Sequence, residues 1–346
     1  MSCMECPVCG EDCVHEAHEL IETLPEVFTP CHSCRGRVLD KRKPLPGLTY
    51  ENPCACGKRF IDEVFAHLYV ILVEDEVFDG TESLATVGIP LIHPGFFMNR
   101  PPYLPIRSLV LVSPVVTEKT AVRITREVPE VRGVVRSDNF VPGMADPLLL
   151  SPPRTYTLLA GCDVRANVFN TGYGHVVIYL QQSLMHIEFP RENNPKIDTI
   201  ERKLNESLPR IFVDAVCGAG TLGLAAAGTG VPHVIMNDAW YAAAFWAAFN
   251  LQVNREFFLV DTVTILKDFK TLHQNPVRRE PLKVAESTGA QQIEIYQGDL
   301  FSLPGVIPSQ GKVLTVLDLF HKEEKEMIDR ITDQWRELVH GEVFIP

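Results

Sequence analysis

Val213-Asp-Ala-Val-Cys-Gly-Ala-Gly-Thr-Leu-Gly223 is the stretch of this sequence that decides its fold. The apolar residues 211–213 predict a strand, and Leu224 to Ala227 predict the first turns of a helix. The three glycines between them let the backbone approach a ligand closely, and the helix N-terminus adds unpaired N–H groups. The spacing fits Gly-x-Gly-x-x-Gly, which is also compatible with dinucleotide binding.

Acidic residues stand at the ends of four predicted strands. Asp214 lies four residues before the first glycine, where a carboxylate can accept hydrogen bonds from an amino group held over the loop. Asp238 follows it by 24 residues, at the tip of the second strand 233–238, where an acid suits a ribose diol. Strands 293–299 and 313–318 also end in aspartate. Carboxylates are rarely left near a buried sheet without a partner, so this pattern favours a ligand site over incidental acids in an α/β domain.

The spacing Asp214-x3-Gly218-x-Gly220 resembles motif I of class I S-adenosylmethionine (SAM) methyltransferases. The resemblance implies a Rossmann-like α/β domain with a mostly parallel sheet. It also implies a SAM site in which Asp238 binds the ribose and Asp299 lies beside the adenine. The residues that it assigns to this site are Asp214, Cys217, Gly218, Ala219, Gly220, Asp238, Ala239, Asp299 and Leu300.

Asp318 and His321 follow the fourth predicted strand and are the candidate catalytic residues. The resemblance places them near the transferred methyl group, where His321 could act as a general base. The alternative is a surface histidine in the first turn of an acidic helix. For Asp238 the alternative role is to cap a helix that starts at Ala239. Cys217 fits a small buried residue better than a nucleophile.

A more specific resemblance covers residues 105–254. The order of a small α/β unit, a β-hairpin, a short helix and motif I, followed by Asn250-x3-Asn254, is similar to the archaeal and eukaryotic tRNA guanine-N1 methyltransferases and the related wybutosine-pathway aminocarboxypropyl transferases. This sequence departs from them at Asp318-Leu-Phe-His321, where that family has an Asn-Pro-Pro-like motif. It also has a long insertion at 255–290 and no sixth or seventh strand after 342–346. The N-terminal domains, or a partner chain in a homodimer, would cover the exposed fifth strand.

Eight of the ten cysteines lie in the first 60 residues. Their pairs form two Cys-x2-Cys knuckles and one Cys-x-Cys knuckle. Two such pairs supply four thiolates, which suits tetrahedral zinc. We therefore predict a zinc-ribbon-like module whose ligands are Cys6, Cys9, Cys31, Cys34, Cys54 and Cys56. Cys13, His15 and His18 are available to complete a second site, and the pairing stays open.

A second interpretation of the cysteines starts from a different spacing. Cys3, Cys6, Cys9 and Cys13 follow the Cys-x2-Cys-x2-Cys-x3-Cys pattern of a bacterial ferredoxin, although Val14 stands where proline is usual. Unligated cysteines are the third possibility. We expect Cys162 to pack without a cysteine partner.

Composition limits the possible partners and the compartment. The net charge is −12, which excludes broad, non-specific nucleic-acid binding but allows a local basic patch. Residues 35–43 hold five basic side chains and one acid, and could contact phosphate or form a solvated turn. No apolar run is long enough for a membrane span and no signal peptide is evident, so we expect a cytoplasmic protein.

Three parts are predicted: a zinc-binding module at 1–60, a central α+β domain at 61–190 and a SAM-binding methyltransferase domain at 191–346. Residues 61 to about 110 are expected to be β-rich. The predicted function is SAM-dependent methylation of RNA, with tRNA as the substrate that the resemblance implies. Methylation of a protein or small molecule, and SAM binding without catalysis, are the two alternatives.

Overall fold

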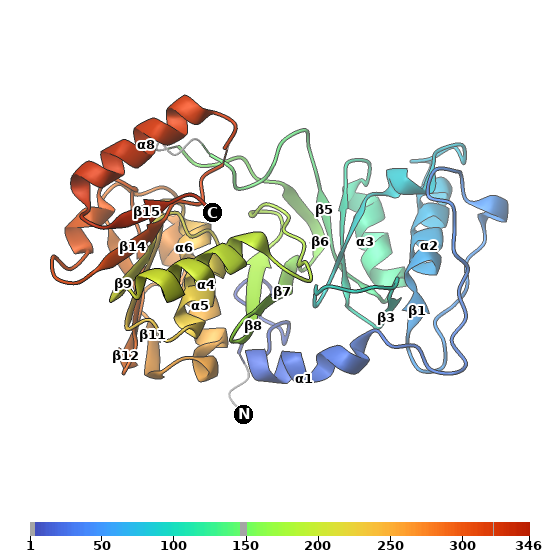
Figure 1. Cartoon of the computed structure of the whole chain (residues 1–346). Helices are drawn as coiled ribbons and strands as arrows, with labels where there is room; N and C mark the ends of the chain where they lie inside the picture. Colours follow the sequence, from blue (N-terminus) through green and yellow to red (C-terminus); the bar gives the residue numbers. More distant parts are fainter. Residues whose placement is uncertain (1–3, 146–150, 321) are drawn as a thin grey trace.

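The computed structural model describes residues 4–145, 151–320 and 322–346. Figure 1 shows the large sheet and its helices at one end of the molecule, and the sheet that contains β5 and β6, with α2 and α3, at the other end. A β-hairpin and the first helix lie between them. Cys3, residues 146–150 and His321 lie outside the described residues.

The large sheet has seven strands in the order β11-β12-β13-β10-β9-β14-β15. Five of them are parallel: β9 (Ile211–Asp214), β10 (His233–Asp238), β13 (Gln292–Gln297), β14 (Val313–Val316) and β15 (Glu342–Phe344). Successive parallel strands run outward from β9 to β13 and then from β14 to β15, so the topology switches between β9 and β14. The predicted Rossmann-like α/β fold with a mostly parallel sheet is confirmed.

Helices cover both faces of this sheet because its strand residues alternate. Phe212 packs in one core with α5 (Thr221–Gly228) and α6 (Tyr241–Val253). Its neighbour Val213 packs on the opposite face in the core that contains Trp335 of α8 (Lys325–Leu338). The aromatic residues of α6 are buried in the first of these cores. The predicted short helix is α4 (Pro195–Ser207), which begins at a proline.

The long insertion extends the sheet. Residues 255–290 form η3 (Arg255–Phe257), β11 (Val260–Ile265), α7 (Phe269–His273) and β12 (Leu282–Gly289). β12 pairs antiparallel with β13 and β11 antiparallel with β12, so the insertion covers one edge of the parallel core. At the other edge β15 pairs with β14, and the homodimer or partner chain over it stays a prediction.

The central part contains the predicted α/β unit and hairpin. β4 (Leu109–Ser113) and β5 (Val131–Arg136) are parallel, with α3 (Glu118–Glu127) between them in the chain and Thr117 as its N-cap. β2 (Ile89–Ile92) and β6 (Thr157–Gly161) complete that sheet. β7 (Val164–Thr171) and β8 (Gly174–Gln181) form a separate hairpin, whose last pair is Thr171 with Gly174. Outside this central part, the short helix η4 (Leu303–Val306) follows β13 of the large sheet.

The prediction of β structure after residue 61 was wrong in part. Ile61–Glu74 is helix α2, and η2 (Leu84–Val87) follows it. A continuous apolar run does not distinguish a buried strand from a buried helix, and α2 is buried on nearly all sides. Before it lie α1 (Ala17–Val27), η1 (Pro46–Leu48) and β1 (Arg59–Phe60), which pairs with β3 (Tyr103–Leu104). Phe28 and Leu39 share a core with α2, and the domain boundaries at 60 and 190 stay predictions.

Candidate functional site

A cavity of about 180 Å³ lies at the carboxyl ends of β9, β10, β13 and β14, beside the switch point of the sheet. Open α/β sheets bind their ligands at this position. Eight of the nine residues predicted for the cofactor site line the cavity, together with Asp318: Asp214, Cys217, Gly218, Ala219, Asp238, Ala239, Asp299 and Leu300. The ninth, Gly220, begins α5 with a φ of 89°, and a Cβ there would lie 3.2 Å from Cβ of Ala247 in α6.

Asp214 has one free acceptor on the cavity wall. Its Oδ2 accepts a hydrogen bond from N–H of Gly223 (2.9 Å), in the first turn of α5. Its Oδ1 has no hydrogen-bond partner among the described residues. Burial, with a further contribution from the charge of Asp318, raises the pKa of Asp214 to about 8. A buried carboxylate with a free oxygen fits a ligand ammonium group, which would satisfy that oxygen and favour the ionised form.

Asp238 ties the glycine loop to the second strand. Its Oδ2 accepts from N–H of Gly218 (3.1 Å) and its Oδ1 from N–H of Trp240 (2.9 Å). Burial raises the pKa of Asp238 to about 6. α6 begins at Tyr241, two residues later than the helix start proposed at Ala239. Each oxygen keeps a second lone pair, so the carboxylate can accept from a diol while it holds the loop.

The remaining predicted residues complete the cavity rim. Asp299 accepts from N–H of Phe301 (2.9 Å) through Oδ1. Leu300 is buried beneath it. Asp318 lies between two lysines, with Oδ2 2.6 Å from Nζ of Lys196 and Oδ1 2.8 Å from Nζ of Lys322. His321, the second candidate catalytic residue, lies outside the described residues.

Three titratable residues of the cavity, His186, Glu188 and Lys196, were missed by the sequence analysis. His186 and Glu188 lie in the segment between β8 and α4, and both line the cavity. Burial, and then the charge of Lys196, lowers the pKa of His186, whose ring packs edge-on against Phe320. Burial raises the pKa of Glu188. The alternating His-x-Glu spacing in an extended segment just before Pro195 is the signal that could have revealed them.

The Asn250-x3-Asn254 pair connects α6 to the hairpin. The amide of Asn250 accepts from N–H of Tyr179 and donates to the carbonyl of the same residue, both at 2.8 Å. It also donates to the carbonyl of Ala219 in the glycine loop (2.9 Å). Asn254 makes the same reciprocal pair with Val177 (2.9 and 2.7 Å). The two amides thus take the place of a neighbouring strand along β8 and support the loop from behind.

Four of the predicted metal ligands form one group, which we call the Cys31 cluster: Cys31, Cys34, Cys54 and Cys56. Their sulfur atoms all lie within 4.8 Å of one another, with Cys31 3.7 Å from Cys54 and Cys34 3.5 Å from Cys56. A tetrahedral zinc–thiolate site with bonds of about 2.3 Å has edges of about 3.8 Å, so this donor set fits zinc.

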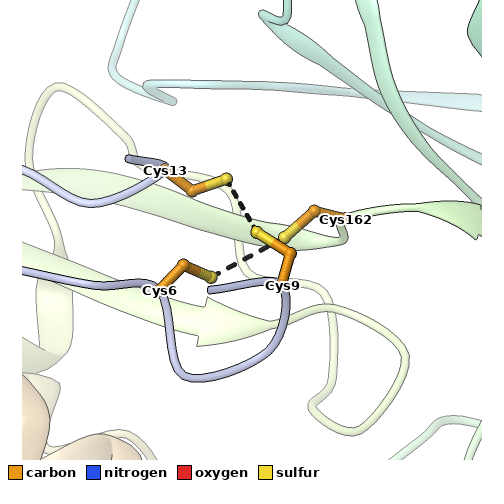
Figure 2. A group of neighbouring side chains, drawn as sticks. All are labelled: Cys6, Cys9, Cys13 and Cys162. Carbon is orange, nitrogen blue, oxygen red and sulfur yellow. Dashed lines mark hydrogen bonds between the residues drawn. The ribbon is translucent and has the colours of Figure 1, made fainter. Parts of the chain in front are cut away.

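The other two predicted ligands belong to a second group, the Cys162 cluster: Cys6, Cys9, Cys13 and Cys162. The expectation that Cys162 packs without a cysteine partner was therefore wrong. Its sulfur lies 3.8 Å from that of Cys6, although the two residues are 156 positions apart (Figure 2). Spacing within the first 60 residues could not reveal a ligand from the β6–β7 junction.

The basic stretch at 35–43 is largely neutralised. Arg37 pairs with the buried carboxylate of Glu63 (2.8 Å), and Lys41 pairs with Asp62 of the same helix, α2. Lys43 lies 3.7 Å from Asp40. The fold therefore uses much of this charge to attach the stretch to α2.

The helices of the chain also bear on membrane insertion. Among the described residues no helix combines the length and the apolar character that crossing a bilayer requires.

No known protein-family model matches the chain, and no curated protein matches it. Two solved structures are similar to it in the arrangement of helices and strands. One is described as the complex structure of aTrm5 and tRNALeu; it matches over 77% of this chain with 12% identity and a TM-score of 0.38, and this chain spans 62% of that chain. The other is P. horikoshii TYW2 in complex with MeSAdo, which matches over 79% of this chain and 88% of that chain with 14% identity and a TM-score of 0.37.

Proposed function

We propose that the protein is a SAM-dependent transferase that modifies RNA, with tRNA as the substrate class. The observation that carries the SAM assignment is the cavity at the switch point, where the free oxygen of Asp214, the loop-bound carboxylate of Asp238 and the side chain of Asp299 line one wall. SAM offers an ammonium group, a ribose diol and an adenine, which match these three acids in the order of their strands.

Each polar residue of the cavity has a proposed role in the transfer. SAM, when bound, supplies an electrophilic carbon on a sulfonium. Asp214 and Asp238 would hold its two polar ends, and the glycine loop would let it lie close to the backbone. His186 is buried with a lowered pKa and is therefore neutral at pH 7, so it can accept a proton from a protonated acceptor atom. Asp318, held between Lys196 and Lys322, would orient the acceptor at the rim.

The acceptor class has weaker support than the cofactor. RNA is favoured by the sequence resemblance across residues 105–254 and by the cysteine-rich N-terminal part. A protein or small-molecule acceptor is favoured by the net charge of −12 and by the ion pairs that occupy Arg37 and Lys41. The transferred group is proposed to be methyl, and transfer of the aminocarboxypropyl group is the alternative within the same resemblance.

We also propose that the Cys31 cluster binds one zinc ion with a structural role. It draws its ligands from two short loops that have little apolar core of their own. Thiolate coordination would supply folding free energy to that segment.

Two experiments test the cofactor, the transferred group and the acceptor separately. Calorimetry should first show micromolar binding of SAM and of S-adenosylhomocysteine. The protein is then incubated with RNA, protein and small-molecule fractions from a deletion strain, once with SAM labelled in the methyl group and once with SAM labelled in the aminocarboxypropyl chain.

Methyl label in the tRNA fraction is expected, with at least a tenfold loss in His186→Gln because that residue serves as the base. Label in protein or small molecules would overturn the acceptor assignment. Binding without any transfer would favour a non-catalytic SAM protein, and absence of binding in folded, zinc-loaded protein would overturn the SAM assignment itself.

A further inference from the structure

We propose that the Cys162 cluster is a second zinc site, distinct from the Cys31 cluster, and that it fastens the N-terminal segment to the junction between β6 and β7. Three ligands come from residues 6–13 and the fourth comes from the centre of the chain. A zinc ion here would connect two segments that are far apart in sequence.

The four sulfur atoms have the size and shape of a mononuclear site. All lie within 4.8 Å of one another, and the Cys6–Cys162 and Cys9–Cys13 separations are 3.8 and 3.2 Å. Figure 2 shows the four side chains converging on one point from separate backbone segments. One ion at the centre of a tetrahedron with edges of about 3.8 Å fits this spacing, and four thiolates in tetrahedral array are the donor set of zinc or of an iron–sulfur centre, of which we propose zinc.

The backbone on both sides is shaped to present these sulfur atoms. Gly10, directly after Cys9, has a φ of 73°, and its N–H donates to the carbonyl of Cys6 (2.9 Å), which closes a tight knuckle turn. On the other side Gly161 has a φ of 73°, and N–H of Cys162 donates to the carbonyl of Arg132 (2.8 Å). Both glycines adopt a left-handed conformation that other residues rarely adopt, so each turn depends on glycine.

Charge balance supports a loaded site. Four thiolates around one zinc ion carry a net charge of about −2. Nη2 of Arg107 donates to Sγ of Cys13 (3.3 Å), and Nη2 of Arg132 lies 3.5 Å from the carbonyl oxygen of the same residue. Arg132 is nearly fully buried, where an unbalanced guanidinium would be costly. Arg107 also pairs with Glu11 (2.7 Å), so Arg132 is the guanidinium whose charge the zinc–thiolate centre would balance.

The proposed zinc site lies where the N-terminal segment packs on the hairpin of β7 and β8. Val14, Ala17 and Leu20 of the N-terminal segment are buried in one core with β7 and β8. N–H of His15 donates to the hydroxyl of Tyr179 (3.0 Å), and Glu16 pairs with Arg255 (2.7 Å). The metal would hold the segment in place at Cys162 while these contacts align it along the hairpin.

Zinc content of matched cysteine variants tests the proposal. Plasma emission spectrometry of the full-length wild-type protein should give about two zinc ions per chain. Cys162→Ala and Cys56→Ala should each retain about one, and the double variant should retain none. Cys217→Ala is the control, because Cys217 is buried in the cofactor cavity and belongs to neither cluster; it should keep both ions.

A second measurement needs no variant and so survives misfolding of Cys162→Ala. Wild-type protein is alkylated with and without a chelator and the cysteines are mapped by mass spectrometry. Cys6, Cys9, Cys13 and Cys162 should become reactive together, and separately from the Cys31 cluster in a chelator titration.

The proposal would be overturned if the wild-type protein held only one zinc ion per chain and Cys162→Ala kept that ion. Iron in place of zinc, a disulfide among these four cysteines, or reactivity of Cys162 that does not depend on the chelator would also overturn it. None of these readouts depends on SAM, so the proposal can fail while the proposed function stands, and the reverse.

Discussion

Asp214 is held in a position that penalises its charge while no ligand is bound. Its folded pKa of about 8 lies above the unfolded value of about 3.9, so the folded state binds more protons between these pH values. The stabilisation that protonated Asp214 contributes is therefore fully present below pH 4 and is lost as the pH rises to 8. A neutral side chain of the same shape would not show this loss.

Asp214→Asn should therefore gain stability relative to the wild type as the pH rises. Each unit of pKa difference corresponds to about 1.4 kcal/mol, so we expect at least about 2 kcal/mol in favour of the variant at pH 8.5 and a much smaller difference near pH 5. Urea unfolding of the ligand-free proteins across this range measures the difference. Parallel pH profiles for the two proteins would contradict a buried, uncompensated carboxylate.

Asp238 combines two roles, because its carboxylate holds N–H of Gly218 and of Trp240 at the edge of the cavity. Asp238→Ala should weaken SAM binding by about 10- to 100-fold, through loss of charged hydrogen bonds to the ribose worth about 1.5–3 kcal/mol. It should also lower the free energy of unfolding by about 1–3 kcal/mol, because two backbone donors lose their acceptor.

Calorimetry and urea unfolding on the same variant separate the two effects. Normal SAM affinity in a destabilised Asp238→Ala would show that the residue serves only the loop and the start of α6. That result would remove Asp238 from the cofactor site.

Helix α6 and strand β8 are joined by side-chain amides in place of a strand ladder. Asn250 and Asn254 make equivalent reciprocal pairs with β8, but only Asn250 also reaches the glycine loop, at the carbonyl of Ala219. Variants of the two residues can therefore be compared. Both lose the contact between α6 and β8, but only a variant of Asn250 also loses the hydrogen bond to the glycine loop.

Asn250→Ala and Asn254→Ala should each cost about 2–4 kcal/mol of stability, because each leaves buried backbone groups of β8 without partners. Only Asn250→Ala should weaken binding of S-adenosylhomocysteine by more than about threefold, since it also releases the loop carbonyl. Urea unfolding and calorimetry check both values. Equal losses of affinity in the two variants would mean that the helix acts on the site as a rigid body and not through Ala219.

At the scale of the whole molecule, the described residues hold two proposed metal clusters and a cofactor cavity that share no residues. Chelation should therefore release the N-terminal part while the seven-stranded sheet stays folded. Hydrogen exchange should show faster exchange in residues 4–60 and around Cys162, with little change in β9, β10 and β14.

S-adenosylhomocysteine at about 100 times its Kd should still stabilise the chelated protein by about 2.7 kcal/mol, as ligand linkage requires. Thermal unfolding with and without the ligand measures this. Loss of the ligand effect after chelation would show that the cysteine clusters and the cavity form one cooperative unit.

The sequence alone determined the features that depend on local pattern. The glycine loop, the acids at the strand ends and the Cys-x2-Cys and Cys-x-Cys knuckles all follow from neighbouring residues, whereas the grouping of the knuckles into metal sites stayed open. Strand period, turn chemistry and knuckle spacing act over a few residues, so they can be recognised before any tertiary contact is known. The acids meet in one cavity because parallel strands place their carboxyl ends on one edge.

Tertiary structure decided what depends on contacts between distant segments. Cys162 joined Cys6, Cys9 and Cys13 only through the packing of the N-terminal segment on the hairpin, and His186 lines the cavity because the segment between β8 and α4 lies against it. The apolar run at 61–74 became a helix because burial on all sides removes the periodic signal that separates helix from strand. In each case the deciding free energy comes from burial and pairing across long chain separations, which local spacing does not encode.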